Sequence, residues 1–218
     1  VTGTNPNGNI TSNTGDLRLG DRNGANNLNG YMDEARISQI ARYSGSSFTP
    51  STTAFKDDKD TILLLHMDGG GGIDPETNLP TLSGQGTYFW DASTNAIFYD
   101  ADTGIPTNKS LISFDGSGDY LNAGSTSDAH MAYDATDWDF GSTDFTLECW
   151  VKVNALPDQP RLFGDSGSNW FFRIGDCSGL KTISAYNGNW FCDDQHGAVS
   201  LGVWHHFAWS RASGTNRF

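Results

Sequence analysis

Hydrophobic and polar side chains alternate most regularly between Asp144 and Val153, in the run DFTLECWVKV. The apolar members occupy every second position: Phe145, Leu147, Cys149, Val151 and Val153. A period of two predicts a half-buried strand, because successive side chains leave opposite faces of the pleat. A strand with one apolar face needs a second sheet to cover it, so the pattern predicts a β-sandwich with Leu147 in its core.

The rest of the chain repeats this design in shorter pieces. Strand-sized runs lie between turn-forming Gly, Asn, Ser and Asp residues, at 16–20, 28–37, 61–67, 88–90, 96–99, 111–114, 119–122, 161–164, 170–174, 181–186, 189–192 and 203–211. Many short strands between turn signals are typical of a sandwich or a barrel. We therefore expect an all-β fold built from antiparallel sheets.

The charge balance argues against two classes of partner. The chain has 13 Lys+Arg residues against 26 Asp+Glu residues, a formal net charge of −13. Such a field repels nucleic acid and anionic lipid surfaces, so no nucleic-acid partner is expected. No run reaches the roughly 18 apolar residues of a membrane span, so no membrane insertion is expected either. The acid excess suits cation binding or a soluble extracellular surface.

Five phrases in the sequence resemble the laminin G-like domain family. SFDGSGDYLNAG (113–124), DFGSTDFTLECWVKV (139–153) and VWHHFAWSR (203–211) stand in that family's order. LRLG (17–20) and LNGYMDEARIS (28–38) resemble its closing strands. The resemblance implies a concanavalin A-like jelly-roll β-sandwich, in which the Trp204 of the WHH phrase packs in the core.

The order of these motifs is inverted, because the closing strands come first. We interpret residues 1–45 as closing strands of one domain, 46–60 as a linker and 61–218 as opening strands of the next. The junction resembles that between tandem copies in bacteriophage virion proteins and large bacterial surface proteins. Two alternatives stay open: one permuted sandwich over 1–218, or strand complementation in which 1–45 completes a neighbouring copy. Pairing of the two segments within one chain would favour the permuted sandwich.

The resemblance also prompts a search for catalytic groups, because glycoside hydrolases occur on the same architecture. These enzymes use paired carboxylates, whereas the organising strand carries only Glu148, which we expect at the surface or a sheet edge. Neighbouring His205 and His206 face opposite sides of a strand and cannot act together on one substrate. No GxSxG motif is present. The sequence therefore predicts a protein that is not an enzyme.

A candidate sugar-binding surface lies on a predicted hairpin whose tip is Asn187-Gly188. Glycan binding requires exposed aromatic rings, which stack on pyranose faces, together with amide or carboxylate side chains. The hairpin and the residues after it supply this set, and our candidates are Tyr186, Asn187, Asn189, Trp190 and Asp194. Cys177 and Cys192 flank the same hairpin, so a disulfide could close it, whereas Cys149 reads as a buried core residue.

Calcium is the one cofactor that the resemblance suggests, since relatives in this fold often carry Ca²⁺. Hard oxygen ligands are plentiful in the chain: Asp33, Glu34, Asp68, Asp115 and Asp119. Asp33 and Asp115 are our candidate metal ligands. In the alternative interpretation, Asp115 and Asp119 cap turns through side-chain hydrogen bonds.

Together these features favour a non-enzymatic laminin G-like module at a virion or extracellular surface. Its role would be adhesion to glycans or structural decoration beside neighbouring subunits. The alternative is an accessory glycan-binding region of an extracellular carbohydrate-active enzyme.

Overall fold

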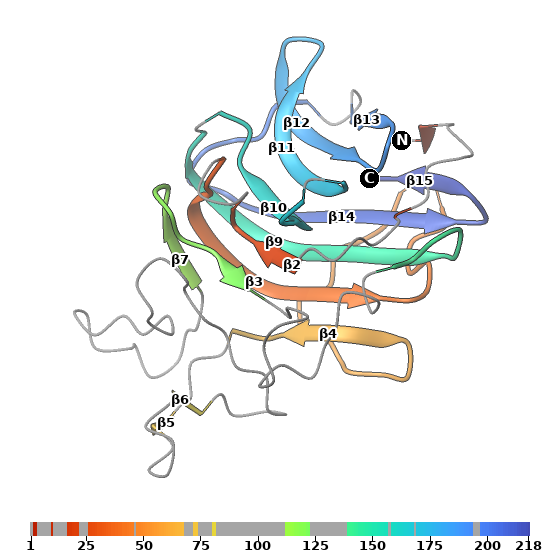
Figure 1. Cartoon of the computed structure of the whole chain (residues 1–218), viewed down its shortest axis with the longest axis horizontal. Helices are drawn as coiled ribbons and strands as arrows, with labels where there is room; N and C mark the ends of the chain where they lie inside the picture. Colours follow the sequence, from red (N-terminus) through yellow and green to blue (C-terminus); the bar gives the residue numbers. More distant parts are fainter. Residues whose placement is uncertain are drawn as a thin grey trace.

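The computed structural model describes residues 2–3, 10, 17–21, 26–45, 47–67, 72–73, 80–81, 112–122, 139–156, 158–167, 169–193 and 197–218. Within these residues every regular element is a β-strand, and two large antiparallel sheets form the body of the molecule (Figure 1). The predicted all-β sandwich is therefore confirmed. The predicted strands at 88–90 and 96–99 lie outside the described residues. No helix in the described part is long and apolar enough to cross a membrane.

The first sheet has the strand order β1-β15-β14-β9-β3-β4, and β7 also pairs with β3. Its strands are β1 (Thr2–Gly3), β15 (Thr215–Arg217), β14 (Trp204–Ala212), β9 (Phe145–Ala155), β3 (Asn29–Ser38), β4 (Thr61–Leu65) and β7 (Ile112–Asp115). In Figure 1, β14, β9 and β3 run side by side as the long strands of this sheet. The alternating run from Asp144 to Val153 therefore forms most of β9, which lies at the centre of the sheet.

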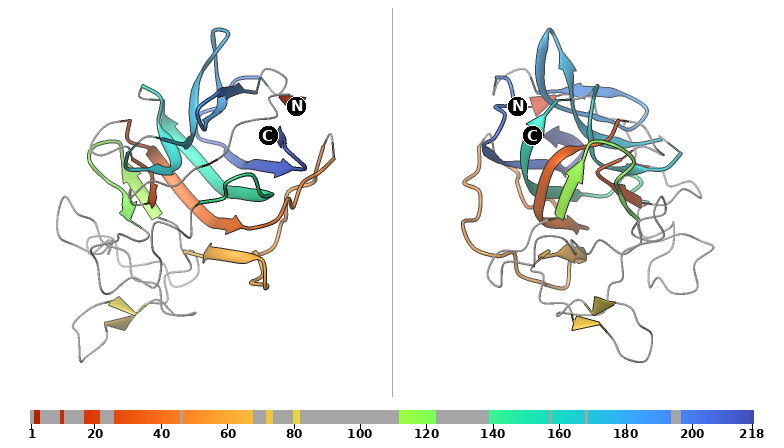
Figure 2. Two further views of the ribbon diagram at one scale, coloured as in Figure 1. Left: turned by 45° about the vertical axis from the view of Figure 1, so that its right-hand side comes forward. Right: turned by 90° about the vertical axis from the view of Figure 1, so that its left-hand side faces the viewer.

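The second sheet has the order β13-β12-β11-β10-β2-β8. Its strands are β13 (Trp190–Cys192), β12 (Leu180–Tyr186), β11 (Phe171–Cys177), β10 (Arg161–Asp165), β2 (Leu17–Leu19) and β8 (Leu121–Asn122). A separate pair, β5 (Gly72–Ile73) and β6 (Pro80–Thr81), forms a two-stranded sheet. The strands of the second sheet lie across the inner face of the first (Figure 2).

The core between the sheets contains the predicted apolar row. Phe145, Leu147, Cys149, Val151 and Val153 are all 0% exposed. The predicted burial of Trp204 is wrong, since that residue is 37% exposed. Trp209, which pairs with Leu147 across the β14–β9 ladder, is the buried tryptophan of this strand. Trp204 stands five positions from Trp209, so the period of two turns it to the opposite face.

The first 45 residues supply strands to both sheets of the same chain. In the first sheet, β3 pairs with β4 through Ala35↔Leu65 and Ile37↔Leu63. In the second sheet, β2 pairs with β10 through Leu19↔Phe163. Such intrachain pairing is what a single permuted sandwich requires. The division into tandem domains stays a prediction.

The connection from β3 to β4 packs on the outer face of the first sheet; we call its residues 39–45 and 47–60 the strap. Arg42 ties its two ends together, because the guanidinium donates to both carboxylate oxygens of Asp58, at 2.9 and 3.0 Å. Glu34 of β3 holds its middle by accepting the Phe55 N–H at 2.6 Å. In Figure 2 the strap runs along the outside of the sheet. The segment expected as a linker thus covers a sheet face.

Replacing Leu147 with Ala should lower the free energy of unfolding by about 2–5 kcal/mol, because it leaves a cavity in a fully packed core. Urea unfolding monitored by tryptophan fluorescence measures this change. Asn154→Ala, at an exposed position of the same strand, is the control and should change stability little. A Leu147→Ala variant as stable as the wild type would contradict the burial of this face.

Candidate functional site

Three aromatic residues stand in one row on the outer face of the second sheet. The strand register places Phe171 opposite Tyr186, and Tyr186 opposite Trp190. Their chain neighbours Phe172, Ala185 and Phe191 lie in the core, so the alternation turns the row away from it. Phe171 and Tyr186 stack at 5.3 Å between ring centroids, and Tyr186 meets Trp190 at 5.1 Å. We call this row, with the arginines beside it, the Trp190 face.

The Trp190 side chain is the exposed end of the row. It is 56% exposed, whereas Phe171 is 6% exposed. An exposed indole at the end of an ordered stack presents a large apolar surface with fixed orientation. This surface is suited to stacking against a flat ligand.

Two arginines lie over the rings of the face. The Arg173 guanidinium carbon is 4.4 Å from the Trp190 ring centroid and 5.2 Å from that of Phe171. The Arg161 guanidinium carbon lies 4.1 Å from the Phe171 centroid. These are cation–π distances, so the rings and the positive charges stabilise one another.

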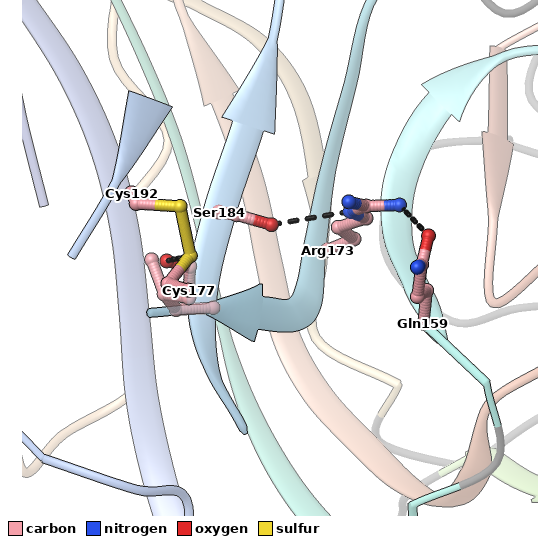
Figure 3. Close-up of a disulfide and its surroundings, with 6 residues drawn as sticks. Gln159, Arg173, Cys177, Ser184 and Cys192 are labelled. Atoms are coloured by element: carbon pink, nitrogen blue, oxygen red, sulfur yellow. Dashed lines mark hydrogen bonds between the residues drawn. A yellow bond between two sulfur atoms is a disulfide. The ribbon is translucent and has the colours of Figure 1, made fainter. Parts of the chain in front are cut away.

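Hydrogen bonds fix the direction of the Arg173 side chain across the sheet. Its Nε donates to Ser184 Oγ at 3.1 Å, and its Nη1 donates to Gln159 Oε1. Figure 3 shows Arg173 between these two residues, with the disulfide beyond Ser184. Gly175 provides the space for this contact, because a Cβ at that position would lie 2.9 Å from Arg173 Nε and 2.7 Å from Ser184 Oγ.

The disulfide between Cys177 and Cys192, which the sequence analysis gave only as possible, is formed in this structure. Cys177 at the end of β11 is bonded to Cys192 of β13, and the Cα atoms are 5.7 Å apart (Figure 3). The bond crosses β12, which lies between these two strands. It therefore ties down the short strand that carries Trp190. Cys149 is the buried free cysteine of the described chain, and burial, with the nearby Glu148 charge, raises its thiol pKa.

The structure brings together part of the predicted sugar-binding set. Tyr186 and Trp190 form the outer end of the row, and Asn189 is half-buried at the hairpin tip. Asn187 is 4% exposed, and its N–H donates to the Asn189 carbonyl at 3.2 Å, so it shapes the turn. Asp194 lies outside the described residues.

Sequence reasoning missed three residues of the face: Phe171, Arg161 and Arg173. A signal for two of them is present in FFRIGDC, because Phe171 and Arg173 alternate with the core residues Phe172 and Ile174. The contact between Arg173 and Trp190 depends on the register of three strands. No single stretch of sequence contains that register.

The candidate calcium ligands are not neighbours in the structure. Asp115 pairs with Asn29 on β3, and Asp33 stands four residues further along that strand, roughly 13 Å away at about 3.3 Å per residue. Asp115 Oδ1 accepts the Ser117 N–H at 2.6 Å, and Asp33 Oδ1 accepts the Glu34 N–H at 2.9 Å. Asp68 is not among the described residues, which contain no cluster of three metal-ligating side chains. Calcium binding stays a prediction.

The expectation that Glu148 lies at the surface or a sheet edge is wrong. Its side chain is fully buried under the strap. Arg36 Nε donates to Oε1 at 2.8 Å, the Tyr43 hydroxyl donates to Oε2 at 2.5 Å, and His206 Nε2 lies 3.1 Å from Oε2. The polar side of β9 is turned away from the core as predicted, but the strap covers it.

The surroundings of Glu148 keep it ionised. Burial alone would raise the carboxyl pKa, but hydrogen bonds from His206 and Tyr43 and the Arg36 charge outweigh burial, so the pKa is lowered. Burial, and then the Glu148 charge, raise the pKa of the Tyr43 hydroxyl well above its ordinary value. Both carboxylate oxygens are occupied by partners from the protein. This site therefore holds the strap in place.

The neighbouring His205 and His206 face opposite sides of β14, as expected. His206 lies under the strap, with its ring centroid 5.4 Å from that of Phe48. His205 Nε2 lies 3.0 Å from the Ser200 carbonyl oxygen.

The fold and the Trp190 face define an all-β sandwich module that presents an ordered aromatic surface. We compared the sequence with models of known protein families. Residues 115–218 match a laminin G model described as the concanavalin A-like lectin/glucanases superfamily. The resemblance noted in the sequence is thereby confirmed, while the tandem arrangement stays a prediction. Neither the curated proteins nor the solved structures contained a match to the chain.

Glu148→Gln should lower the free energy of unfolding at neutral pH by about 3–5 kcal/mol, because it leaves the Arg36 charge buried without its partner. The folded-state carboxyl pKa lies below the ordinary value of 4.5. The stabilisation is therefore complete above about pH 4.5 and is lost as the pH falls through the folded-state pKa.

Melting temperatures measured from neutral to acidic pH test this expectation. The wild type should lose stability in acid, and Glu148→Gln should show a flatter acid limb. Asp57→Asn, at an exposed strap position, should follow the wild-type curve. An identical acid limb in Glu148→Gln would contradict the role assigned to this carboxylate.

Reducing the Cys177–Cys192 bond should destabilise the fold by about 3 kcal/mol in the chain-entropy model, given a sequence separation of 15 residues. Thermal unfolding with and without a phosphine reductant measures the effect. The Cys177→Ser/Cys192→Ser variant should melt at the lower temperature and should not respond to the reductant. A reductant-insensitive wild type would contradict the bond.

Proposed function

We propose that the chain is a non-enzymatic glycan-binding module and that the Trp190 face is its binding surface. The observation that carries this proposal is the 56% exposure of Trp190 at the end of a stacked aromatic row. A tryptophan buried on folding or binding contributes a large apolar area, so leaving it in water forgoes that stabilisation. A ligand that covers the indole recovers it.

A pyranose ring fits this requirement. Its C–H face is apolar and of a size comparable to the indole, and its hydroxyls can bond to polar groups at the rim. The rim here contains Asn189 at the hairpin tip and Gln159 beside Arg173. The match of residues 115–218 to a family model named for lectins and glucanases supports a carbohydrate ligand.

The setting that we propose is a virion or extracellular surface, where the module adheres to glycans or contacts neighbouring structural subunits. Strand complementation between copies is part of this proposal. The inverted motif order supports it, whereas in this structure β3 pairs with strands of its own chain. The same face would also serve an accessory region of a carbohydrate-active enzyme, and the sequence that flanks this chain in its parent protein distinguishes the two.

Trp190→Ala should abolish binding on a glycan array while lowering stability by no more than about 1 kcal/mol, the size of an exposed cation–π contact. Trp204→Ala is the matched control: Trp204 is 37% exposed but belongs to β14 of the other sheet. Array binding and thermal unfolding are measured on both variants and on the wild type.

Two results would count against the proposal. The first is full array binding by Trp190→Ala, which would move the binding site elsewhere. The second is the absence of any bound glycan for the folded wild-type protein.

A further inference from the structure

We propose that the Cys177–Cys192 bond is a redox switch for the Trp190 face, and that Cys192 is the sulfur at which a thiol reductant attacks it. Breaking the bond releases β13, the strand that carries Trp190, while the rest of the sandwich stays folded. The release of β13 is argued from the structure alone, and only its effect on glycan binding rests on the proposed function.

The two cysteines of the bond differ in their access to solvent (Figure 3). Cys192 is an exposed residue of an edge strand, whereas Cys177 is 2% exposed. A thiolate reduces a disulfide by attacking one sulfur and displacing the other, so access decides which sulfur forms the new bond. A reductant in solution therefore bonds to Cys192 and displaces Cys177.

The buried cysteine has a hydrogen-bond acceptor for its reduced form. Cys177 Sγ lies 3.8 Å from the main-chain carbonyl oxygen of Ile183, a distance that a thiol hydrogen bond can span. A thiol is a weak donor, and a donor that keeps a partner avoids the cost of an unsatisfied buried group. The reduced Cys177 can therefore stay in its place at the end of β11.

With a dithiol as the reductant, the exchange balances in two steps. One reagent thiolate bonds to Cys192 Sγ, the protein S–S bond breaks, and Cys177 leaves as a thiolate that takes up a proton. The second reagent thiolate then attacks the reagent sulfur that is bonded to Cys192, and Cys192 is released as a thiol. The protein gains two electrons and two protons, and the reagent becomes a cyclic disulfide.

Few other contacts hold β13 in the sheet. It is a three-residue strand at the end of the sheet order, and in the described structure it pairs with β12 alone. Of its three residues, Phe191 belongs to the core, whereas Trp190 is 56% exposed. Edge segments with few buried contacts open at a low cost in free energy. The disulfide is the covalent tie that keeps this short strand on the sheet.

The neighbouring strands do not depend on the bond in the same way. β12 pairs with β11 at seven positions, from Phe171↔Tyr186 to Cys177↔Leu180. The tight turn at Ser178 and Gly179 joins these two strands without the disulfide. The long strands β9, β14 and β3 belong to the other sheet. We therefore expect reduction to open β13 and to leave β11, β12 and the first sheet folded.

The bond limits the opening of β13 because it restricts the freed chain. It joins residues with a sequence separation of 15. In the chain-entropy model a cross-link over such a loop disfavours the open chain by about a hundredfold. Losing the bond should raise the open population of β13 by that factor. Trp190 leaves the row with its strand, because its contact with Tyr186 depends on the Tyr186↔Trp190 pair.

Hydrogen exchange followed by mass spectrometry tests the opening without any ligand. The oxidised wild-type protein and the same protein reduced with dithiothreitol are compared well below the melting temperature of the reduced form. Amide exchange in β13 should become about a hundredfold faster on reduction, since the exchange rate follows the open population. Peptides from β9 should keep their protection.

Two variants assign the effect to the bond. Cys177→Ser/Cys192→Ser should exchange in β13 as fast as the reduced wild type and should not respond to the dithiol. Cys149→Ala is the matched control, because it removes the third cysteine and keeps the bond, so it should respond as the wild type does. The comparison of the two wild-type states decides the question even where a variant fails to fold.

The attacked sulfur is identified with a monothiol. Brief treatment with glutathione is stopped by acid, which protonates the thiolates that carry the exchange, and the adducts are mapped by mass spectrometry. The adduct should lie on Cys192, with Cys177 recovered as a thiol. An adduct mainly on Cys177 would overturn the assignment of the attacked sulfur.

The outcomes for the switch and for the proposed function are distinguishable. Unchanged exchange in β13, or an equal loss of protection in β9, would overturn the local switch. Several-fold weaker binding of the reduced protein on the glycan array supports both proposals. Full array binding by a reduced protein whose β13 is open would overturn the Trp190 face as the glycan site and leave the switch in place.

Discussion

One buried carboxylate, that of Glu148, holds together segments that are far apart in the sequence. Its oxygens are bonded by Arg36 of β3 and Tyr43 of the strap, and they lie beside His206 of β14. A buried charge is costly unless every lone pair has a partner, so these segments must be in place together. The strap therefore belongs to the folded unit as firmly as the strands do.

This constraint makes the two outer faces of the sandwich different. Tyr43, Phe48 and Phe55 of the strap surround His206 on the first sheet, so the chain itself covers this part of that face. On the second sheet the row that ends at Trp190 reaches solvent, and the disulfide holds its edge strand. The more exposed of the two outward-facing tryptophans is therefore on the second sheet, since Trp190 is 56% exposed and Trp204 is 37% exposed. This contrast is why the proposed function is placed there.

The parts of this structure that local patterns determine could be predicted from the sequence. Leu147 and its row were predicted by a period of two, which needs no knowledge of the partner sheet. Trp204 was misplaced because its role was taken from a resemblance, whereas its position relative to Trp209 on β14 decides which face it occupies. Glu148 was misplaced because a polar strand face reads as solvent-facing, and the strap over it comes from residues about 100 positions earlier.

The same network limits how copies of this chain could share strands. Arg36 and Tyr43 both come from the first 45 residues, and both must reach Glu148 in the last segment. In a single permuted sandwich the chain supplies them to itself, as it does in this structure. In a tandem or complemented array, a neighbouring copy would have to supply β3 and the strap together, since β3 alone would leave a Glu148 oxygen without Tyr43 and His206 without its cover. Exchange between copies is therefore an exchange of the whole segment from β3 to the end of the strap.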